Sequence, residues 1–392
     1  MKTIRDLELK GKRVLIRTDF NVPMNEQGEI TDDLRIRMVL PTLEYALAQG
    51  AKVIIASHSG RPKGKRVEKY SLAPIAKRLA ELLGKEVKLA ADCVGPEAEA
   101  AVAALNAGEI LLLENLRYHA EEEANDPAFS QQLAALADVY VNDAFAVSHR
   151  AHASVAGITA HIKEKAAGLL LHKELDYFHR AIDAPQRPLV AIVGGAKVSS
   201  KLKALTRMLD KVDKMLIGGA MANTFLKSQG FAVGAASKIE DDLLDSARQI
   251  LADAKAKGVK VYLPVDVIAA DRFAPDAVCK QVTVQDIPEG WMALDIGPAS
   301  VICFSEVLAD AKTIVWNGPM GAFEMDAFAR GTMALAHAVA SSHALSITGG
   351  GDSNAAVTQS GEAANISYMS TGGGAFLELM EGKVLPGVAA LE

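Results

Sequence analysis

Short apolar runs rich in Val, Ile and Leu recur along the chain and alternate with longer stretches of helical periodicity. The runs lie at residues 14–17, 53–56, 110–113, 139–141, 189–193, 215–217, 261–263, 313–315 and 344–347. Because they do not alternate with polar residues, we expect strands that are covered on both faces. Helical stretches such as 72–83 and 241–256 separate them. This repetition predicts an α/β fold with right-handed crossovers and doubly wound, mainly parallel sheets.

The length of 392 residues is too great for one ordinary domain and fits two of comparable size. A helical pattern over 169–182 is followed by 183–188 (DAPQRP), which predicts a helix end and a turn. We therefore expect two Rossmann-like domains joined by this helix, with a cleft between them. The N-terminal domain is placed at 1–170 and the C-terminal domain at 171–374.

Charge and composition argue against several classes of partner. The formal net charge is -6, so we expect no binding to nucleic acid or to an anionic membrane. No apolar run approaches the ~20 residues needed to cross a bilayer, and the N-terminus has no apolar signal region. The three cysteines are widely spaced and form no Cys-x-x-Cys pair, so neither a disulfide framework nor a cysteine zinc site is expected. A cytoplasmic location follows as the expectation.

Most arginines lie in the first 150 residues, and several follow predicted strands. These are Arg17, Arg61, Arg117 and Arg150. Ligands on open α/β sheets bind at the carboxyl ends of strands, where guanidinium groups can hold phosphate and carboxylate. A single arginine on an acidic protein is more often the solvated partner of a carboxylate. The group as a whole predicts an anion site, to which two histidines, His58 and His152, could add donors.

The strands of the second half end in glycines instead, at 194–195, 218–219, 318, 349–351 and 372–374. After the first of these turns we expect a helix that carries Lys197 and Lys201 on one face. A helix N-terminus beside two lysines predicts a phosphate site. A tight turn is the better explanation of any one Gly-Gly pair, but not of five glycine-rich strand ends in one half of the chain. Neither the P-loop pattern nor the dinucleotide pattern Gly-x-Gly-x-x-Gly is present.

Residues 344–354 predict a strand, a glycine turn and the start of a helix. Asp352 and Ser353 are residue types that cap helix N-termini. Asp352 could also take part in a magnesium site, because Mg²⁺ prefers few carboxylates together with substrate phosphates. The acidic run at 121–123 is interpreted as the start of a solvated helix.

Several of these segments resemble the phosphoglycerate kinase family in its bacterial form. They are 17–23 (RTDFNVP), 58–62 (HSGRP), 113–117 (LENLR), 194–198 (GGAKV), 316–319 (WNGP), 349–352 (GGGD) and 370–374 (STGGG). Each segment alone is modest, but the set occurs in the family's order and spans the chain. The family usually has Leu where Ser59 stands and often Thr where Ser353 stands. The hydroxyl of Ser353 is kept, and His58 and Arg61 are in place.

The resemblance implies ligands and site residues. In the N-terminal domain, 3-phosphoglycerate would be held by Asp19, Asn21, Arg35, His58, Ser59, Gly60, Arg61, Arg117, Arg150 and His152. In the C-terminal domain, the nucleotide would be held by Gly195, Ala196, Lys197, Lys201, Gly218, Gly219, Asn317, Glu324, Gly350, Gly351, Asp352 and Ser353. The metal would be Mg²⁺ at Asp352. The catalytic residues would be Arg35, Lys197, Gly351 and Gly373. The segment 375–392 would pack back against the N-terminal domain, and the protein would be a monomer.

The implied reaction is the reversible conversion of ATP and 3-phosphoglycerate into ADP and 1,3-bisphosphoglycerate, in glycolysis and gluconeogenesis. A carboxylate acceptor is already ionised at neutral pH, since an unperturbed carboxyl pKa is about 4, so no general base is needed. Catalysis then depends on alignment and charge stabilisation. Because acceptor and nucleotide groups lie in different domains, we expect direct in-line transfer after the domains close.

Two other classes stay open at this point. A dinucleotide or nucleotide-sugar enzyme could use two Rossmann-like domains, although the dinucleotide fingerprint is missing. A non-catalytic protein could bind an anionic metabolite between two domains. Such a binding protein would not need Lys197 and Arg35 together, because its ligand is not transferred.

Overall fold

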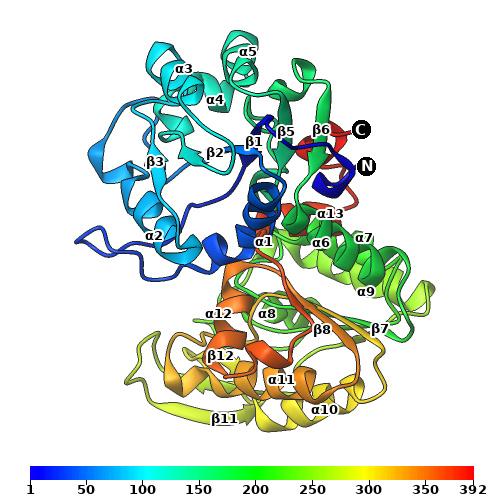
Figure 1. Ribbon diagram of the computed structural model, residues 1–392. Coiled ribbons are helices and arrows are strands. Elements are labelled where there is room, and N and C mark those ends of the chain that lie inside the picture. Colours follow the sequence, from blue (N-terminus) through cyan, green and yellow to red (C-terminus); the bar gives the residue numbers. More distant parts are fainter. The chain divides into compact units, whose positions relative to one another are not determined.

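Each of two parts of the chain builds its own six-stranded parallel sheet. The computed structural model describes residues 1–392, and Figure 1 shows the course of the chain. Unit 1 comprises Met1–Leu175 and Val384–Glu392, and unit 2 comprises Asp176–Lys383.

The sheet of unit 1 has the strand order β3-β4-β2-β1-β5-β6. Its strands are β1 (Arg13–Arg17), β2 (Lys52–Ala56), β3 (Val87–Leu89), β4 (Ile110–Leu112), β5 (Val139–Asn142) and β6 (Glu164–Ala167). All neighbouring pairs are parallel. The strand order reverses direction next to β1, and ligands bind at the carboxyl ends of the strands at such a point.

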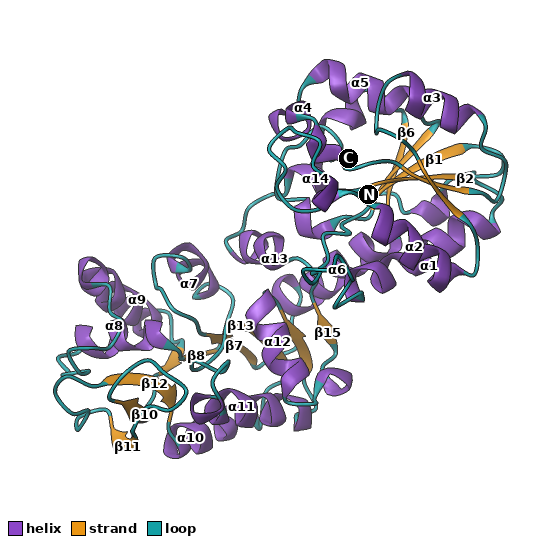
Figure 2. Ribbon diagram, turned by 90° about the vertical axis from the view of Figure 1, so that its left-hand side faces the viewer, coloured by secondary structure: helices purple, strands orange, loops and turns teal.

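Helices cover both faces of this sheet. They are α1 (Leu34–Ala48), α2 (Ala73–Leu83), α3 (Pro96–Ala103), α4 (Ala120–Ala124), α5 (Pro127–Ala135) and α14 (Pro386–Ala389). Figure 2 shows α1 and α2 on one face and α3 and α5 on the other. Alternate residues of β1 and β2, such as Val14 and Val53, pack with apolar residues of α1 and α2 in one buried cluster. The intervening residues, such as Leu15 and Ile54, are buried as well, as expected of strands covered on both faces.

The sheet of unit 2 has the order β15-β14-β13-β7-β8-β9, and its neighbouring strands are also parallel. Its strands are β7 (Leu189–Val193), β8 (Lys214–Ile217), β9 (Lys260–Tyr262), β13 (Thr313–Asn317), β14 (Leu345–Thr348) and β15 (Tyr368–Met369). A second, antiparallel sheet has the order β11-β10-β12. Its strands are β10 (Asp266–Ala270), β11 (Cys279–Thr283) and β12 (Met292–Ile296).

The helices of unit 2 are α7 (Leu202–Met208), α8 (Ala220–Ser228), α9 (Leu244–Ala256), α10 (Pro298–Leu308), α11 (Arg330–Ser341), α12 (Gly351–Gln359) and α13 (Gly373–Met380). Helix α8 packs against α9, and α10 packs against α11. Trp316 and Phe304 are fully buried in the main core of this unit. No helix of either unit combines the length and apolar character required to cross a membrane.

The chain passes from one unit to the other within α6 (Leu169–Phe178), which is followed by a π-helical turn at His179–Asp183. The first turn of α6 is held by Asp143, whose Oδ1 accepts a hydrogen bond of 3.0 Å from the amide of Leu171. At the other end of the chain, the amide of Gly387 donates to the carbonyl of Ser148, and its carbonyl accepts from the side chain of Asn142.

The predicted α/β fold with parallel, doubly wound sheets is confirmed. Each predicted apolar run overlaps a strand, with ends shifted by one or two residues. Sequence analysis missed the antiparallel sheet, because β11 (CKQVT) is mostly exposed and carries no apolar run. It also missed β3, β6 and β15, which are short or begin with charged residues.

The core of unit 2 gives a test by matched substitutions. Phe304→Ala removes a fully buried ring, whereas Phe273→Ala removes a ring that is 65% exposed. We expect Phe304→Ala to lower the free energy of unfolding by about 3–5 kcal/mol. Phe273→Ala should lower it by less than about 0.5 kcal/mol. Urea denaturation followed by circular dichroism measures both, and equal effects would contradict the assignment of the core.

Candidate functional site

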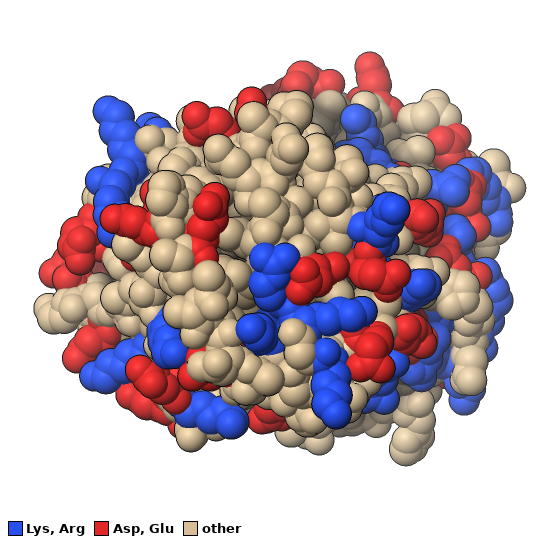
Figure 3. All heavy atoms as spheres, turned by 45° about the horizontal axis from the view of Figure 1, so that its top comes forward, with Lys and Arg blue, Asp and Glu red and all other residues tan.

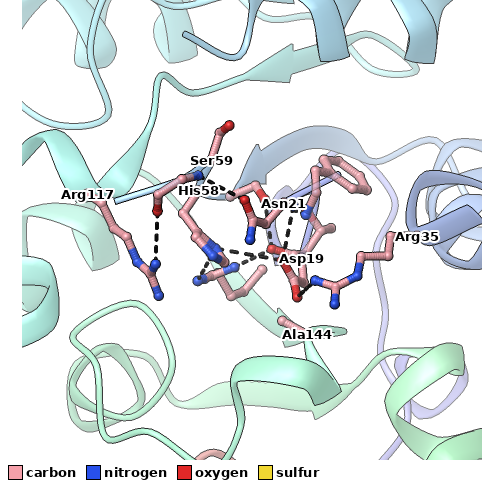
Figure 4. Close-up of polar contacts among 12 residues, drawn as sticks. Asp19, Asn21, Arg35, His58, Ser59, Arg117 and Ala144 are labelled. Carbon is pink, nitrogen blue, oxygen red and sulfur yellow. Dashed lines mark hydrogen bonds and ion pairs between the residues drawn. The ribbon is translucent and has the colours of Figure 1, made fainter. Parts of the chain in front are cut away.

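Polar side chains gather at the carboxyl ends of the strands of unit 1. Asp19 and Asn21 follow β1, and His58 and Ser59 follow β2. Arg117 lies in a 3-10 turn at Leu116–Tyr118, beyond β4. Because neighbouring parallel strands end at the same edge of a sheet, these residues converge although the chain separates them widely. Figure 4 shows Arg117 and Arg35 on opposite sides of His58 and Asp19.

Hydrogen bonds order this group. Oδ2 of Asp19 accepts from Nη1 of Arg35 at 2.6 Å, and Oδ1 of Asp19 lies 3.8 Å from Nδ1 of His58. Oδ1 of Asn21 accepts from the amide of Gly60 at 2.8 Å, and the carbonyl of Gly60 accepts from Nη1 of Arg117 at 3.1 Å. The turn at Gly60, with φ +61°, therefore joins the residues after β1 to those after β4.

The electrostatics of this group favour an anion. His58 is buried, and burial followed by the charges of Arg17 and Arg117 holds its pKa well below the usual value. Burial and the same two arginines lower the pKa of His152 to about 4. Burial also lowers the pKa of Arg117, although Glu123 opposes the shift. Because the arginines disfavour further positive charge, the site is electropositive while its histidines are neutral.

The prediction that Arg17 belongs to the anion site is wrong, although Arg17 does lie at the end of a strand. Its side chain is fully buried, its Nε donates to Oγ of Ser154 at 2.8 Å, and its Nη1 donates to the carbonyl of Thr18. Oε1 of Glu122 lies 3.9 Å from its Nη2. The interpretation of the run 121–123 as a solvated helix is therefore wrong for Glu122, which is buried to balance Arg17. Sequence alone gave no signal for this pair.

The other predicted anion-binding residues differ in their exposure to solvent. Arg61 is exposed, and no hydrogen bond or ion pair holds its side chain. Arg150 is half-buried, and its Nε lies 3.2 Å from Nε2 of His149. Ser59 is buried, and its carbonyl accepts a hydrogen bond of 2.7 Å from Asn115. Asn115 was quoted only as part of a motif, but it fixes the turn that carries His58.

Charges of both signs are mixed on one face of the molecule. On the face drawn in Figure 3, Lys and Arg side chains are intermixed with Asp and Glu. An anion would therefore be attracted by the local cluster of arginines at the strand ends rather than by a broad basic surface.

Glycine turns meet at the carboxyl ends of the central strands of unit 2. A Cβ atom on Gly219 would lie 2.5 Å from the amide nitrogen of Gly195, and one on Gly194 would lie 2.1 Å from the carbonyl oxygen of Pro319. A Cβ atom on Gly218 would lie 2.3 Å from Sδ of Met320. The turns after β7, β8 and β13 therefore touch through bare backbone, and only glycine permits this approach. Pro319 and Met320 complete the group, and sequence analysis had not assigned them a role.

Lys201 crosses this group of turns. Its Nζ donates to the carbonyls of Gly194 at 2.6 Å and of Asn317 at 2.9 Å. Burial lowers the pKa of Lys201 to about 8, and the charge of Asp352 opposes the shift. The predicted helix carrying Lys197 and Lys201 on one face is wrong. Helix α7 begins only at Leu202, because residues 196–201 form turns, and Lys197 is exposed on that loop.

Two helices of unit 2 begin with glycine near these turns. Helix α12 starts at Gly351 after Gly350, which has φ +101°, and α13 starts at Gly373. A Cβ atom on Gly373 would lie 3.2 Å from Cα of Gly350, so the two N-termini are adjacent. Their free amides form a natural site for phosphate oxygens.

The prediction that Asp352 or Ser353 caps α12 is wrong, because the N-cap position belongs to Gly350. Oγ of Ser353 instead accepts from the amide of Gly318 at 2.6 Å and donates to the carbonyl of Gly349 at 3.0 Å. Asn317 donates to the same carbonyl at 2.7 Å. Asp352, Ala196 and Glu324 are exposed around the turns, so the contacts within the protein do not hold them in one arrangement.

Arginines at the strand ends of one α/β unit, and glycine turns with two helix N-termini in the other, are an arrangement that suits a kinase. The family model described as phosphoglycerate kinase matches residues 4–383. A phosphoglycerate kinase of Desulfotalea psychrophila is 69% identical over 392 residues and covers the whole of both chains. One of Synechococcus elongatus is 59% identical over 388 residues, covering 98% of this chain and 96% of its own.

Solved structures agree with this result. The phosphoglycerate kinase of Coxiella burnetii has a TM-score of 0.91 at 45% identity, covering 99% of this chain and 98% of its own. That of Pyrococcus horikoshii has a TM-score of 0.86 at 33% identity, covering 100% and 98%. The chain belongs to the phosphoglycerate kinase family.

The neutral state of His152 can be measured. We expect its imidazole to protonate only near pH 4 in the folded protein without ligand, because burial and three arginines disfavour the charged form. The unfolded chain takes up this proton near 6.5, so the folded state should lose stability as the pH falls from 6.5 towards 4. A nuclear magnetic resonance titration, with His152→Gln to assign the signal, measures the pKa. A midpoint near 6.5 would contradict the electropositive site.

Proposed function

We propose that the protein catalyses reversible phosphoryl transfer between ATP and the carboxylate of 3-phosphoglycerate, giving ADP and 1,3-bisphosphoglycerate. The observation that carries this proposal is the presence of two different strand-end sites in one chain. Unit 1 offers arginines and neutral histidines, and unit 2 offers glycine amides, helix N-termini and Lys201. The proposal includes a role in glycolysis and gluconeogenesis as a cytoplasmic monomer.

The acceptor substrate carries a phosphate, a hydroxyl and a carboxylate, and unit 1 offers partners for each. Arg61, Arg117 and Arg150 would bind the anionic groups, with His58 and His152 as neutral hydrogen-bond partners. Asp19 and Asn21 would accept a hydrogen bond from the hydroxyl. Ser59 and Gly60 would shape the turn around the substrate. Arg35 is partly exposed and is held by Asp19 alone, so it can turn towards the reacting group.

The nucleotide would bind at the glycine turns of unit 2. Gly195, Ala196, Gly218, Gly219 and Asn317 would shape its pocket, Lys201 and Glu324 would hold it, and the residues 350–353 would receive its phosphates. Asp352 is an exposed carboxylate in the first turn of α12, beside free helix amides, and this donor set fits a magnesium ion that arrives with the nucleotide. When bound, the ion would neutralise phosphate charge.

Transfer needs no proton abstraction, because the accepting carboxylate is already ionised. The chain therefore has to align the two substrates and stabilise charge on the transferred group. Arg35 from unit 1 and Lys197 from unit 2 would neutralise its oxygens, together with the amides of Gly351 and Gly373. This division of roles favours in-line transfer without a covalent intermediate on the protein.

The alternative of a non-catalytic binding protein is not favoured by any specific observation. Lys197 is an exposed cation of unit 2 and Arg35 is a partly exposed cation of unit 1, and this pair suits a group in transfer better than a ligand at rest. The relatives and solved structures reported above are phosphoglycerate kinases.

A coupled assay tests the proposal. Purified protein with MgATP and 3-phosphoglycerate is combined with glyceraldehyde-3-phosphate dehydrogenase, and NADH oxidation is followed. We expect the wild type to turn over and Lys197→Ala to lose kcat by roughly 100-fold or more, with KM little changed, because the lysine acts on the transition state. Lys203→Ala, an exposed lysine of α7, is the matched control and should stay near wild type.

The opposite result is equally clear. A folded wild type that binds both ligands but oxidises no NADH would overturn the kinase proposal. An unchanged kcat in Lys197→Ala would contradict the proposed role of that lysine.

The two substrates must meet for transfer, although their proposed sites lie in different units. We therefore expect the units to close only when both substrates are bound, which also excludes water from the reacting phosphate. Small-angle X-ray scattering should give a smaller radius of gyration with 3-phosphoglycerate and a non-hydrolysable MgATP analogue together than with either alone. An unchanged radius would argue against closure.

A further inference from the structure

A thiol, an imidazole and a carboxylate lie together in unit 1, at residues that the proposed kinase reaction does not use. Asp92 and Cys93 follow β3, and His119 follows the 3-10 turn that carries Arg117. One potential ligand atom from each residue lies within 4.8 Å of the other two. Sequence analysis did not predict this group, because the three residues come from two separate segments of the chain.

The three side chains are already held in place. Nε2 of His119 lies 2.7 Å from Oδ1 of Asp92, and the same oxygen accepts from the amide of Cys93 at 2.6 Å. The ring of His119 packs against that of Phe129, with centroids 5.3 Å apart. Cys93 is fully buried, whereas the side chains of Asp92 and His119 are about 30% exposed. The cluster therefore has an inner, soft ligand and two outer ligands that solvent reaches.

A pocket of about 800 Å³ opens onto the outer side of the cluster. Asp92, Val94 and His119 line it, whereas Cys93 is buried and does not. Three further carboxylates line the same pocket, from Glu97, Glu121 and Asp126. No lysine or arginine lines it. Because its lining is acidic, the pocket attracts a cation. It also has room for a water molecule bound to that cation.

We propose that Asp92, Cys93 and His119 bind a zinc ion, with a water molecule from the pocket as the fourth ligand. One sulfur, one nitrogen and one oxygen are a mixed donor set that suits a borderline ion such as Zn²⁺ and does not suit Mg²⁺. Tetrahedral zinc with bonds of about 2.0–2.3 Å holds its ligand atoms about 3.3–3.7 Å apart. Nε2 of His119 and Oδ1 of Asp92, at 2.7 Å, would therefore move apart slightly to admit the ion. On binding, a sulfur–zinc bond forms, the sulfur–hydrogen bond breaks, and the proton leaves to solvent.

The ion would act as a clip rather than as a catalyst. It would join the segment between β3 and α3 to the start of α4, two residues beyond Arg117. The lack of a Cys-x-x-Cys pair excluded a cysteine-rich zinc site. The proposed site does not need such a pair, because the imidazole of His119 and the carboxylate of Asp92 complete the ligands around a single thiol.

Cobalt provides the test, because Co²⁺ replaces Zn²⁺ and a cobalt–thiolate bond gives a charge-transfer absorption band in the near ultraviolet. Metal-free full-length protein is titrated with Co²⁺ and then with Zn²⁺. We expect the band to saturate at one cobalt per chain and to disappear when zinc is added. Cys93→Ser should abolish it, and His119→Gln should weaken cobalt binding at least tenfold.

The chain offers matched controls in its two exposed cysteines, Cys279 and Cys303. The double variant Cys279→Ser, Cys303→Ser should keep the band in full. Zinc should also raise the melting temperature of this control but not that of His119→Gln, whose altered side chain is partly exposed and leaves the core intact. A band that needs Cys279 or Cys303, or no band in a folded protein, would overturn the proposal. So would unchanged binding in His119→Gln.

Discussion

The buried contact between Arg17 and Glu122 holds the strand-end site of unit 1 in shape. Both side chains are fully buried, so each charge depends on its partners for compensation. Arg17 is fixed to the strand edge through Thr18 and reaches Ser154. Glu122 accepts from the amide and hydroxyl of Ser154 at 2.9 and 2.5 Å. Removal of either charge would leave the other unpaired inside the protein, which is far more costly than the loss of a surface ion pair.

The contact between Arg17 and Glu122 also affects the two histidines of the strand-end site. The carbonyl of Glu122 also accepts from the amide of Ala153, so α4 fixes the segment that carries His152. Arg17 in turn lies 3.4 Å from Nδ1 of His58 and helps to keep both histidines neutral. The internal ion pair thus positions the segment that carries His152, and Arg17 adds to the effect of burial in lowering the pKa of both histidines. In unit 2, backbone contacts hold the glycine turns in place. The glycines let the turns touch, and Nζ of Lys201 donates hydrogen bonds to the carbonyls of two of them.

The sequence predicted the parts of the structure that depend on local pattern. Buried strands were recognised as unbroken apolar runs, and the residues after them marked the edge at which the polar groups of unit 1 and the glycine turns of unit 2 gather. The same reasoning failed for Arg17. The sequence pattern of an arginine at a strand end is the same whether its side chain faces a ligand or a buried glutamate such as Glu122. It failed for Lys197 and Lys201 because their spacing does not show where the helix begins. Helix α7 begins at Leu202, after both lysines.

Other features depend on contacts between distant segments and left no local signal. The polar strand β11 pairs with β10 only in the folded unit. The lowered pKa values of His58 and His152 result from burial and from Arg17 and Arg117, which come from different segments of the chain. Asp92, Cys93 and His119 likewise meet only after β3 and β4 have paired.

The central claim is that arginines at the strand ends of unit 1 hold 3-phosphoglycerate, and calorimetric titration tests it most directly. Arg117→Met removes the most buried of these charges and keeps the bulk of the side chain, while Arg37→Met removes an exposed arginine of α1 that pairs with Asp33. Arg117→Met should weaken 3-phosphoglycerate binding by about 10–100-fold. It should leave MgADP binding unchanged, and Arg37→Met should bind both ligands like the wild type. Unchanged affinity for 3-phosphoglycerate in a folded Arg117→Met protein would contradict the account.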